Sequence, residues 1–363
     1  GSHNPPQYNG LKMMVAGETL YGDTIQGLLK WIQTEKPVRG VVPGVQRGGY
    51  RELNVWPDYL ANILGHIKLA RPMKIAVDCG NGVAGAFAKT LYEALGCEVT
   101  ELFCEVDGNF PNHHPDPAHP ENLQDLIACV KNGDAEIGLA FDGDGDRLGV
   151  VTKDGEIIYP DRQLILFARD VIARNPGATV IYDVKCTRHV AKAVKAAGGE
   201  PLMWKTGHSL IKAKLKETGA PLAGEMSGHV FFKERWFGFD DGLYAGVRLL
   251  EILSRGSDPS AELNALPNSS STPELQLQTA EGVNFEIVKR LQAEGKFPTS
   301  ESVNTIDGVR AEYADGFGLA RPSNTTPVVV MRFEADSDEA LARIQGEFKA
   351  AILAVAPAVK LPF

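Results

Sequence analysis

The alternation of apolar and polar positions repeats once along the chain. The β-rich run Lys74–Asp78 is followed by a glycine-rich turn at 79–82 and an amphipathic helix through Ala94. Thr179–Asp183 opens the same series, with a polar turn and a helix through Ala197. Glycines end both helices, as they often do, and each helix is followed by an apolar strand, at 97–103 and at 201–204. Because the two series lie about 105 residues apart, they predict a duplicated α/β domain.

Shorter patterns connect and follow the two repeats. Two further helices are expected, at 122–131 and 209–217. The runs Leu148–Thr152 and 156–159 predict a hairpin across a glycine-containing turn. The segment 254–272 is rich in serine, aspartate, asparagine and proline, which is typical of a linker. Beyond it we expect two strands and a C-terminal helix, at Leu275–Gln278, 328–334 and 337–355.

The predicted fold class is therefore α/β: repeated α/β domains with mixed sheets, followed by a C-terminal α+β domain. A chain of 363 residues is too long for one ordinary domain. We place the domain boundaries near 53, 154 and 266, which divides the chain into the segments 1–53, 54–154, 155–266 and 267–363.

Composition narrows the class of protein. Apolar residues make up 44% and charged residues 23% of the chain, as in a globular protein with sizeable cores. The net charge of −9 argues against general nucleic-acid binding, although it allows an anionic substrate in a locally basic pocket. The cysteines are five in number and form no C-x-x-C pair, which predicts a reduced protein without a zinc site. No apolar run reaches the roughly 20 residues of a membrane span, and no signal peptide opens the chain, so we expect a cytoplasmic protein without a membrane partner.

One loop carries a metal-binding pattern. Asp142, Asp144 and Asp146 alternate with glycines directly after the apolar run 137–141. Glycine lets the backbone curl so that several carboxylates point at one place, and clustered carboxylate oxygens suit a hard cation such as Mg²⁺. Arg147 adds a fixed cation suited to a phosphate oxygen. An EF-hand is excluded, since its sixth and twelfth positions would be Arg147 and Lys153; a solvated acidic turn stays open as the alternative.

Three other polar segments are candidates for substrate chemistry. Ser2 beside His3, with Lys12 ten residues on, could be a phosphate-accepting nucleophile with acid and base neighbours, or Gly1-Ser2-His3 could be the scar of a cleaved tag. His208 lies at an expected helix start, where Ser209 could be an ordinary N-cap. The third segment contains Glu225 and Ser227, two residues apart. On an extended segment they would face the same side and could accept from neighbouring sugar hydroxyls. A solvated strand end is the alternative.

The loop 321–327 is a candidate anion site. It gathers an arginine, three hydroxyls and an amide before an apolar strand, with Pro322 and Pro327 near its ends. An arginine fork matches phosphate oxygens, and hydroxyls with backbone N–H groups complete a cradle. A polar hairpin loop is the alternative. The residues proposed to bind phosphate here are Arg321, Ser323, Asn324 and Thr325.

Four of these segments together resemble the α-D-phosphohexomutase superfamily, and within it the bacterial phosphomannomutase/phosphoglucomutase branch. The family's phosphoserine, metal, sugar and phosphate loops occur in the family's order, as Ser-His-Asn-Pro at 2–5, Asp-Gly-Asp-Gly-Asp-Arg at 142–147, Gly-Glu-Met-Ser-Gly-His at 224–229 and Arg-Pro-Ser-Asn-Thr-Thr-Pro at 321–327. The resemblance implies a heart-shaped, four-domain architecture and a native Ser2. Family members carry roughly a further hundred residues of domain 1 before this serine, so 1–53 would be the remainder of that domain, and the missing segment would be needed to complete the active site.

The resemblance also implies a mechanism. One Mg²⁺ per active site would be held by phosphorylated Ser2 with Asp142, Asp144 and Asp146. Phosphate would move between C1 and C6 of a hexose through a 1,6-bisphosphate, so glucose 1,6-bisphosphate would be an intermediate and activator. The other implied catalytic residues are His3, Lys12, Arg147 and His229, with Arg147 orienting the serine phosphate. Glu225 and Ser227 would hold two sugar hydroxyls, His208 and Lys185 would lie near the sugar and its distal phosphate, and the loop 321–327 would clamp that phosphate.

Three alternatives accompany this interpretation. The chain could be a phosphoglucosamine mutase, although Glu-Met-Ser at 225–227 favours the glucose and mannose branch. It could be a truncated form that binds sugar phosphates without turnover. A metal-dependent phosphatase is a weaker alternative, since releasing free phosphate would waste the intermediate. We expect a monomer with hexose phosphates as its small-molecule partners.

Overall fold

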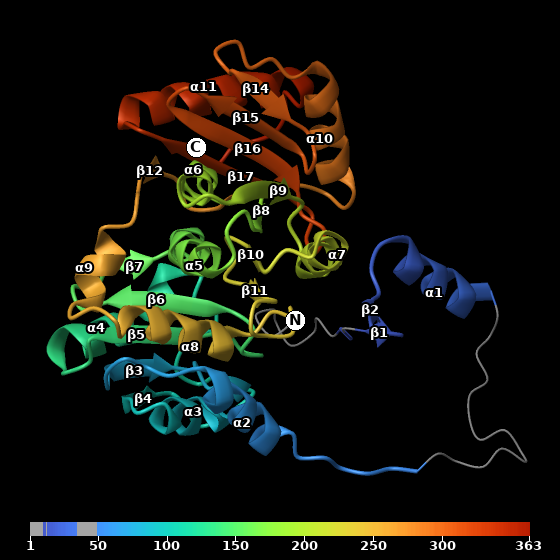
Figure 1. Cartoon of the computed structure of the whole chain (residues 1–363). Coiled ribbons are helices and arrows are strands. Elements are labelled where there is room, and N and C mark those ends of the chain that lie inside the picture. The colour runs from blue at the N-terminus through green and yellow to red at the C-terminus, as the bar shows by residue number, and fades with distance from the viewer. Residues whose placement is uncertain (1–9, 12, 35–48) are drawn as a thin grey trace, which may run out of the picture.

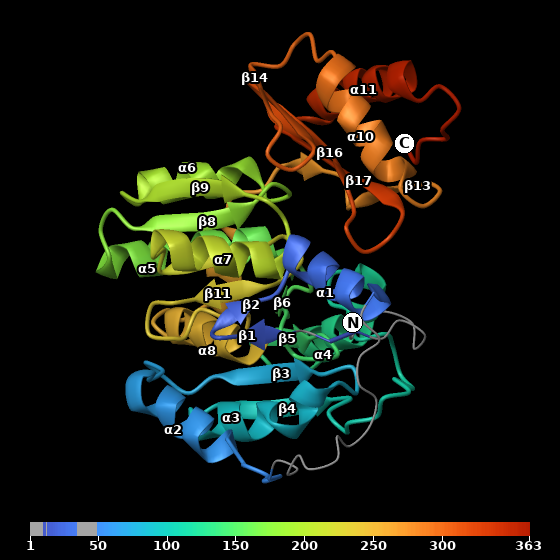
Figure 2. The same cartoon turned by 90° about the vertical axis from the view of Figure 1, so that its right-hand side faces the viewer.

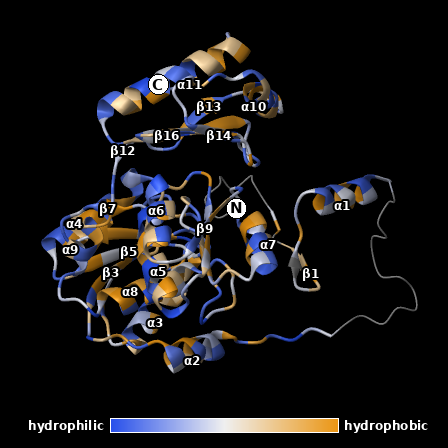
Figure 3. Cartoon of the chain, turned by 45° about the horizontal axis from the view of Figure 1, so that its top comes forward, coloured by the Kyte–Doolittle hydropathy of each residue, from blue (hydrophilic) through white to orange (hydrophobic). Residues whose placement is uncertain are grey.

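The computed structural model of the chain describes residues 10–11, 13–34 and 49–363 (Figure 1). Three larger β-sheets follow one another in chain order from the bottom to the top of Figure 1. The N-terminal described part holds a small hairpin and a helix, namely β1 (Met14–Val15), β2 (Glu18–Thr19) and α1 (Asp23–Thr34). Apolar and polar residues both occur along α1 (Figure 3), and none of its residues is buried against the described chain.

The first sheet is mixed and covered on both faces. Its strands are β3 (Lys74–Asp78), β4 (Glu98–Leu102), β5 (Ile137–Phe141), β6 (Leu148–Thr152) and β7 (Ile157–Ile158), in the order β4-β3-β5-β6-β7. Strand β3 pairs in parallel with β4 and β5, whereas β6 is antiparallel to β5. The flanking helices are α2 (Trp56–His66), η1 (Val83–Ala86), α3 (Ala88–Ala94), η2 (Pro120–Leu123) and α4 (Gln124–Asn132). Helix α4 packs on one face and α3 on the other, so every residue of β5 and β6 is buried.

The second sheet repeats the first. Its strands are β8 (Thr179–Asp183), β9 (Glu200–Trp204), β10 (Leu222–Gly224) and β11 (Val230–Phe232), in the order β9-β8-β10-β11, with the same parallel and antiparallel pairings. The helices around it are α5 (Pro160–Arg174), α6 (Arg188–Ala196), α7 (His208–Thr218) and α8 (Gly242–Leu253). The predicted duplication of an α/β domain is therefore confirmed. Both units place a helix between their parallel strands, because parallel neighbouring strands need a crossover connection.

The third sheet is antiparallel and closes one end of the molecule (Figure 2). Its order is β12-β17-β16-β15-β14, and β13 also pairs with β17. Two helices cover one face, α10 (Val283–Glu294) and α11 (Asp338–Val355). On the other face Phe317 and Leu319 pack with Val184 of the second unit. The strands are β12 (Ser270–Ser271), β13 (Leu275–Gln278), β14 (Ser302–Asn304), β15 (Val309–Tyr313), β16 (Gly316–Pro322) and β17 (Val328–Ala335).

The structure corrects the sequence interpretation of 254–272. This segment is not an unstructured linker, since it contains α9 (Pro259–Asn264) and strand β12. Asp258 caps α9 by accepting a hydrogen bond from the Ala261 N–H, and Pro259 occupies the first helical turn, where its missing N–H costs nothing. The polar residues that suggested a linker therefore belong in part to the start of a helix.

Helix α8 was missed for the opposite reason. All twelve of its residues are buried, between the two α/β sheets, so it lacks the polar face that gives a helix its sequence periodicity. Its sequence is mostly apolar, with Arg248 and Glu251 as its only charged residues, and such a run cannot be separated from a buried strand by periodicity alone.

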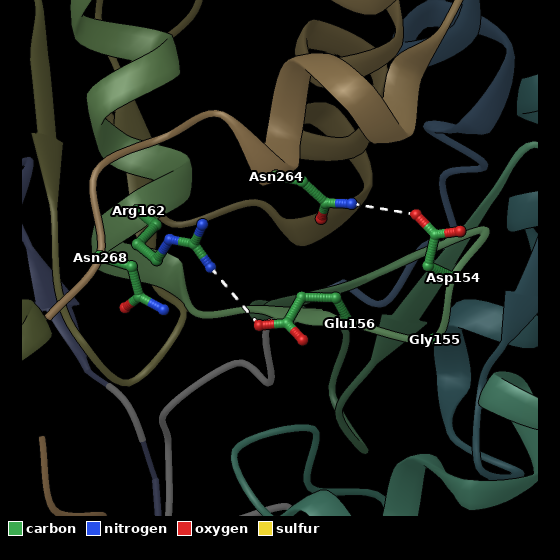
Figure 4. A pocket seen from close by; sticks show the side chains of 6 residues that line it. All are labelled: Asp154, Gly155, Glu156, Arg162, Asn264 and Asn268. Atoms are coloured by element: carbon green, nitrogen blue, oxygen red, sulfur yellow. Dashed lines mark hydrogen bonds and ion pairs between the residues drawn. The ribbon is translucent and has the colours of Figure 1, made fainter. Parts of the chain in front are cut away.

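A hollow of about 290 Å³ lies where α9 meets the β6–β7 turn (Figure 4). The Asn264 amide donates to the Asp154 carboxylate at 3.1 Å, and Arg162 pairs with Glu156 at 3.9 Å. The first contact ties the hairpin of the first sheet to α9, which follows the second sheet, and the second contact ties it to α5. The hollow is at the opposite end of β6 from the acidic loop, so it is separate from the candidate site below.

Candidate active site

The acidic loop forms a compact cluster of carboxylates at the end of β5. The Gly145 N–H donates to the Asp142 carbonyl at 3.1 Å, and the φ of +74° at Gly145 allows this tight turn. One carboxylate oxygen from each of Asp142, Asp144 and Asp146 lies within 4.8 Å of the others. Burial and, after it, the negative charge of Asp146 raise the pKa of Asp142 to about 7. The raised pKa means that the positive charge around the three carboxylates does not balance their negative charge. This donor set fits a hard divalent cation such as Mg²⁺.

A chain of contacts joins this loop to the second α/β unit. Arg147 and His229 form an antiparallel bridge, and the Leu148 N–H donates to the Gly228 carbonyl at 3.3 Å. The Arg147 Nε–H donates to His229 Nε2 at 3.1 Å. On the other side of the ring, His229 Nδ1 lies 3.2 Å from an Asp240 carboxylate oxygen. The two predicted catalytic residues are therefore brought together, with the histidine proton on Nδ1.

Asp240 was not predicted from the sequence, yet it lies among three basic side chains. Lys212 Nζ donates to it at 2.8 Å, and His208 Nδ1 lies 3.8 Å away. Burial would raise the pKa of Asp240, but the hydrogen bond with His229 and the charge of Lys212 hold it well below its usual range. The His208 and His229 rings are 5.8 Å apart, so this carboxylate organises both. No local motif marks Asp240, because its partners lie on other loops and on α7 of the same unit.

The sugar-loop residues adopt a turn and not the extended segment predicted for them. The Gly228 N–H donates to the Glu225 carbonyl at 3.1 Å, and Gly228 has a φ of +103°. Glu225 and Ser227 therefore do not face one side by strand alternation. The Glu225 carboxylate accepts from the Gly207 N–H at 2.5 Å, beside His208 at the start of α7, and Gly207 takes the N-cap position considered for Ser209. Burial, partly offset by His229, raises the pKa of Glu225.

Asp183 links the loops of the second unit. Its carboxylate accepts from the Met226 N–H at 3.1 Å and from the Thr206 hydroxyl at 2.7 Å, and it contacts the Cys186 thiol at 3.1 Å. Sequence analysis did not single out Asp183. A signal was present, since Asp183 ends its strand as Asp78 ends the equivalent strand of the first repeat, and both are buried.

The candidate phosphate segment comes from the third sheet. Arg321 and Pro322 end strand β16 and are not part of the loop, which corrects the prediction, and the loop proper begins at Ser323. The Ser323 hydroxyl lies 3.3 Å from that of Thr325 and accepts from its N–H, while Asn324 and Thr325 are exposed. The Arg321 Nε–H donates to Asp307 at 2.9 Å.

Asp307 connects this segment to the second unit, because it also accepts from the Thr206 N–H at 2.9 Å. Lys185 makes a second connection, with its Nζ 2.9 Å from Glu274. Burial would lower the pKa of Lys185, but Glu274 and Asp183 raise it. Asp307 and Glu274 were also missed by sequence analysis, since each acts across two sheets. Ser2, His3 and Lys12 lie outside the described residues, so their placement stays a prediction.

The match to known families follows the three sheets. The sequence matches the family models for Phosphoglucomutase/phosphomannomutase, alpha/beta/alpha domain II over residues 57–155, alpha/beta/alpha domain III over 159–269 and the C-terminal domain over 274–351. The chain belongs to this family. The resemblance inferred from the four loops is thereby confirmed, and so is the repeated α/β architecture with its C-terminal domain.

Relatives and solved structures in this family cover nearly the whole chain. A phosphoglucomutase of Neisseria meningitidis serogroup A is 63% identical over 97% of this chain and 76% of its own length. A phosphomannomutase/phosphoglucomutase of Pseudomonas aeruginosa is 56% identical over 100% of this chain and 77% of its own length. The crystal structure of a phosphoglucomutase/phosphomannomutase family protein from Burkholderia thailandensis superposes with a TM-score of 0.92, at 64% identity, over 99% of this chain and 76% of that one. Within the described part of this phosphohexomutase, no helix has both the length and the apolar character of a membrane span.

Proposed function

We propose that this chain carries the catalytic and substrate loops of a hexose phosphate mutase that interconverts the 1-phosphate and 6-phosphate of glucose, mannose or both. The observation that carries the proposal is the Arg147–His229–Asp240 contact chain, which joins the acidic loop of the first unit to the sugar loop of the second. It brings a guanidinium, an imidazole and a cluster of three carboxylates to one junction, which supports these roles. Relatives at 54–63% identity with names of this activity support the same conclusion.

Asp142, Asp144 and Asp146 would hold the cation, which would offset the negative charge of a phosphoryl group on Ser2 during transfer. Arg147 would orient that phosphoryl group. Its guanidinium also lies 3.7 Å from Asp142 and 4.0 Å from Asp116, so two carboxylates hold it in place. The phosphoryl group would pass to the 1- or 6-hydroxyl of a bound hexose phosphate and give a 1,6-bisphosphate.

His229 is suited to take the proton of the attacking hydroxyl. Its Nε2 lone pair accepts a hydrogen bond from Arg147, and that nitrogen could take the hydroxyl proton once Arg147 turns from it to the phosphoryl group. Asp240 on Nδ1 would stabilise the imidazolium that forms. Lys12, outside the described residues, is the second candidate for acid and base help, with His3 beside the nucleophile.

Two groups of residues would hold the sugar phosphate. Glu225 and Ser227 would accept from two sugar hydroxyls, with His208 and Lys185 beside them. Arg321, Ser323, Asn324 and Thr325 would clamp the distal phosphate, whichever end of the sugar it is on. The bisphosphate has to turn end over end between its two transfers, so one clamp must serve both orientations.

The test is a coupled assay of the chain with Mg²⁺, glucose 1,6-bisphosphate and either glucose 1-phosphate or mannose 1-phosphate. We expect formation of the 6-phosphate. Ser2→Ala should remove most of this activity and leave substrate affinity within about tenfold, because the serine acts in transfer and not in binding. Near-normal turnover of that variant would reject the nucleophile assignment.

Other outcomes would identify the alternatives. Calorimetric binding of hexose phosphate without turnover would indicate a sugar-phosphate-binding form. Faster conversion of glucosamine 6-phosphate than of either hexose phosphate would indicate a phosphoglucosamine mutase. Steady release of inorganic phosphate from glucose 1,6-bisphosphate would indicate a phosphatase.

A further inference from the structure

Two cysteines that the proposed mechanism does not use face each other in the first α/β unit. Cys79 follows strand β3 and Cys104 follows the neighbouring parallel strand β4 (Figure 2). Their sulfur atoms are hydrogen-bonded at 3.4 Å. A disulfide has a sulfur–sulfur distance of about 2.05 Å, so oxidation needs only a small approach of the two side chains.

The two thiols differ in exposure and chemistry. Cys79 is fully buried, whereas Cys104 is half-buried and reachable from solvent. The contact with the Cys79 sulfur lowers the pKa of Cys104, while the same contact and burial raise the pKa of Cys79. A more exposed thiol with more thiolate is the one an oxidant attacks first, and the buried neighbour is placed to resolve it.

The segment that begins at Cys79 also supports the acidic loop. The Val83 N–H donates to the Gly143 carbonyl at 3.0 Å, and a Cβ added to Gly82 would lie 2.9 Å from Gly143. On its other side, a Cβ on Gly85 would overlap the Cys104 carbonyl oxygen. Because this packing is close, a movement of the thiol pair would displace the loop that carries the three aspartates.

We propose that Cys79 and Cys104 are a redox-active thiol pair that a hydroperoxide converts to an intramolecular disulfide, and that this bond shifts the acidic loop and weakens its hold on a divalent cation. The cation part rests on the proposed function of that loop. The Cys104 thiolate attacks the hydroperoxide and becomes a sulfenic acid, and an alcohol or water leaves. The Cys79 sulfur then attacks the sulfenic sulfur, the disulfide forms, and the hydroxyl leaves as water with the Cys79 proton. Two thiols and one hydroperoxide thus give one disulfide, one alcohol or water, and one water.

The test treats the reduced protein with stoichiometric hydrogen peroxide, blocks the remaining thiols by alkylation, and counts them by intact mass. We expect the free thiols to fall from five to three, a peptide map to show the Cys79–Cys104 cross-link, and dithiothreitol to restore all five. Cys79→Ala should instead accumulate a sulfenic acid on Cys104 that dimedone traps. Cys129→Ser is the matched control, since Cys129 is also half-buried but lies on α4, and it should still form the cross-link.

Calorimetric titration with Mg²⁺ tests the consequence for the loop. Disulfide formation should weaken Mg²⁺ binding about tenfold, as loss of a supporting contact does at other metal sites, and dithiothreitol should reverse it. Oxidation that consumes Cys104 or Cys129 while Cys79 stays free would overturn the thiol pair. A cross-link with unchanged Mg²⁺ affinity would overturn its link to the acidic loop. Lack of mutase activity in the reduced protein would reject the proposed function, and the thiol count would still decide the pair.

Discussion

Single residues of the candidate site owe their properties to what surrounds them. Asp142 and Asp144 belong to one motif, yet Asp142 is fully buried and Asp144 is exposed. The buried carboxylate is costly without a cation beside it, whereas the exposed one is solvated. The side chain of Asp240 is only 6% exposed, but it is held ionised by the basic groups around it. The same residue type therefore has different roles according to burial and partners.

At Asp144, replacing the carboxylate by an amide should weaken the cation site without disturbing the fold. Asp144→Asn removes one charge from an exposed position, so we expect Mg²⁺ affinity to fall about tenfold or more and turnover to fall with it. Titration calorimetry with Mg²⁺ and the Mg²⁺ dependence of activity measure this. Asp154→Asn, an exposed acidic residue in the β6–β7 turn, is the control. Equal Mg²⁺ titrations for the two variants would contradict the assignment.

Asp240 should act on catalysis through His229. Asp240→Asn leaves the ring without a charged partner on Nδ1, so kcat should fall by about tenfold to a hundredfold while KM stays within about twofold. Steady-state kinetics separates the two constants, and a thermal melt checks that the fold is kept. If KM rises and kcat is unchanged, Asp240 positions substrate and not the base.

At the scale of secondary-structure elements, the site is assembled from the ends of strands. The acidic loop follows β5, Asp183 ends β8, the Glu225 turn follows β10, and the phosphate segment begins within the end of β16. Ligands of open α/β sheets collect at the carboxyl ends of strands, which is why loops far apart in sequence meet. Side-chain hydrogen bonds to backbone N–H groups then hold one loop against the next.

Asp307 is the clearest such connection between elements. Asp307→Ala removes the acceptor that serves both Arg321 and the Thr206 N–H, so Arg321 loses its fixed orientation. We expect KM for the hexose phosphate to rise about tenfold, which corresponds to ~1.4 kcal/mol, with kcat little changed. Asp315→Ala, which removes the exposed partner of Arg343, is the control. An equal rise of KM in both variants would mean a general effect on the C-terminal domain.

At the scale of the whole molecule, one network of buried charge joins α5, α8 and the loop between β11 and α8. Arg248 is fully buried and pairs with Asp170 at 3.4 Å and Glu234 at 2.7 Å. Burial would raise the pKa of Asp170, but hydrogen bonds from Arg174 and Arg255 lower it well below its ordinary value. Burial opposes ionisation of Glu234 as well, and Arg174 lowers its pKa.

These lowered pKa values predict a loss of stability in acid. The unfolded chain binds protons on these carboxylates at higher pH than the folded chain does. Their contribution to the free energy of unfolding is therefore complete above the ordinary carboxylate pKa, and it is lost as the pH falls from there through the pKa values of the folded state. Thermal melts at about pH 6 and about pH 3.5 should show a smaller drop in Tm for Asp170→Asn than for the wild type. Asp241, whose pKa burial raises to about 6, contributes in the opposite sense in both proteins. Asp134→Asn, at an exposed site, should keep the full drop; an unchanged drop for Asp170→Asn would contradict the prediction.

Much of the fold could be predicted because the signals are local. Strand β13 has the predicted bounds, and α11 begins one residue after the predicted start because Ser337 is its N-cap. The repeat of strand, turn and helix predicted the duplicated sheets. Helix α8 and the interior of 254–272 could not be predicted, since burial on all sides removes periodicity and a helix cap resembles a linker in composition. The domain boundaries near 53, 154 and 266 remain predictions.

The sequence by itself determined which chemical groups this phosphohexomutase has and the order of its loops, because residue type, glycine spacing and periodicity are properties of short segments. Only the tertiary structure decided which groups meet. Asp240 beside His229, Asp307 beside Arg321, and Cys104 beside Cys79 each pair residues from different segments of the chain. Such contacts depend on how strands are ordered and how sheets pack against one another, and no short window of sequence contains that information.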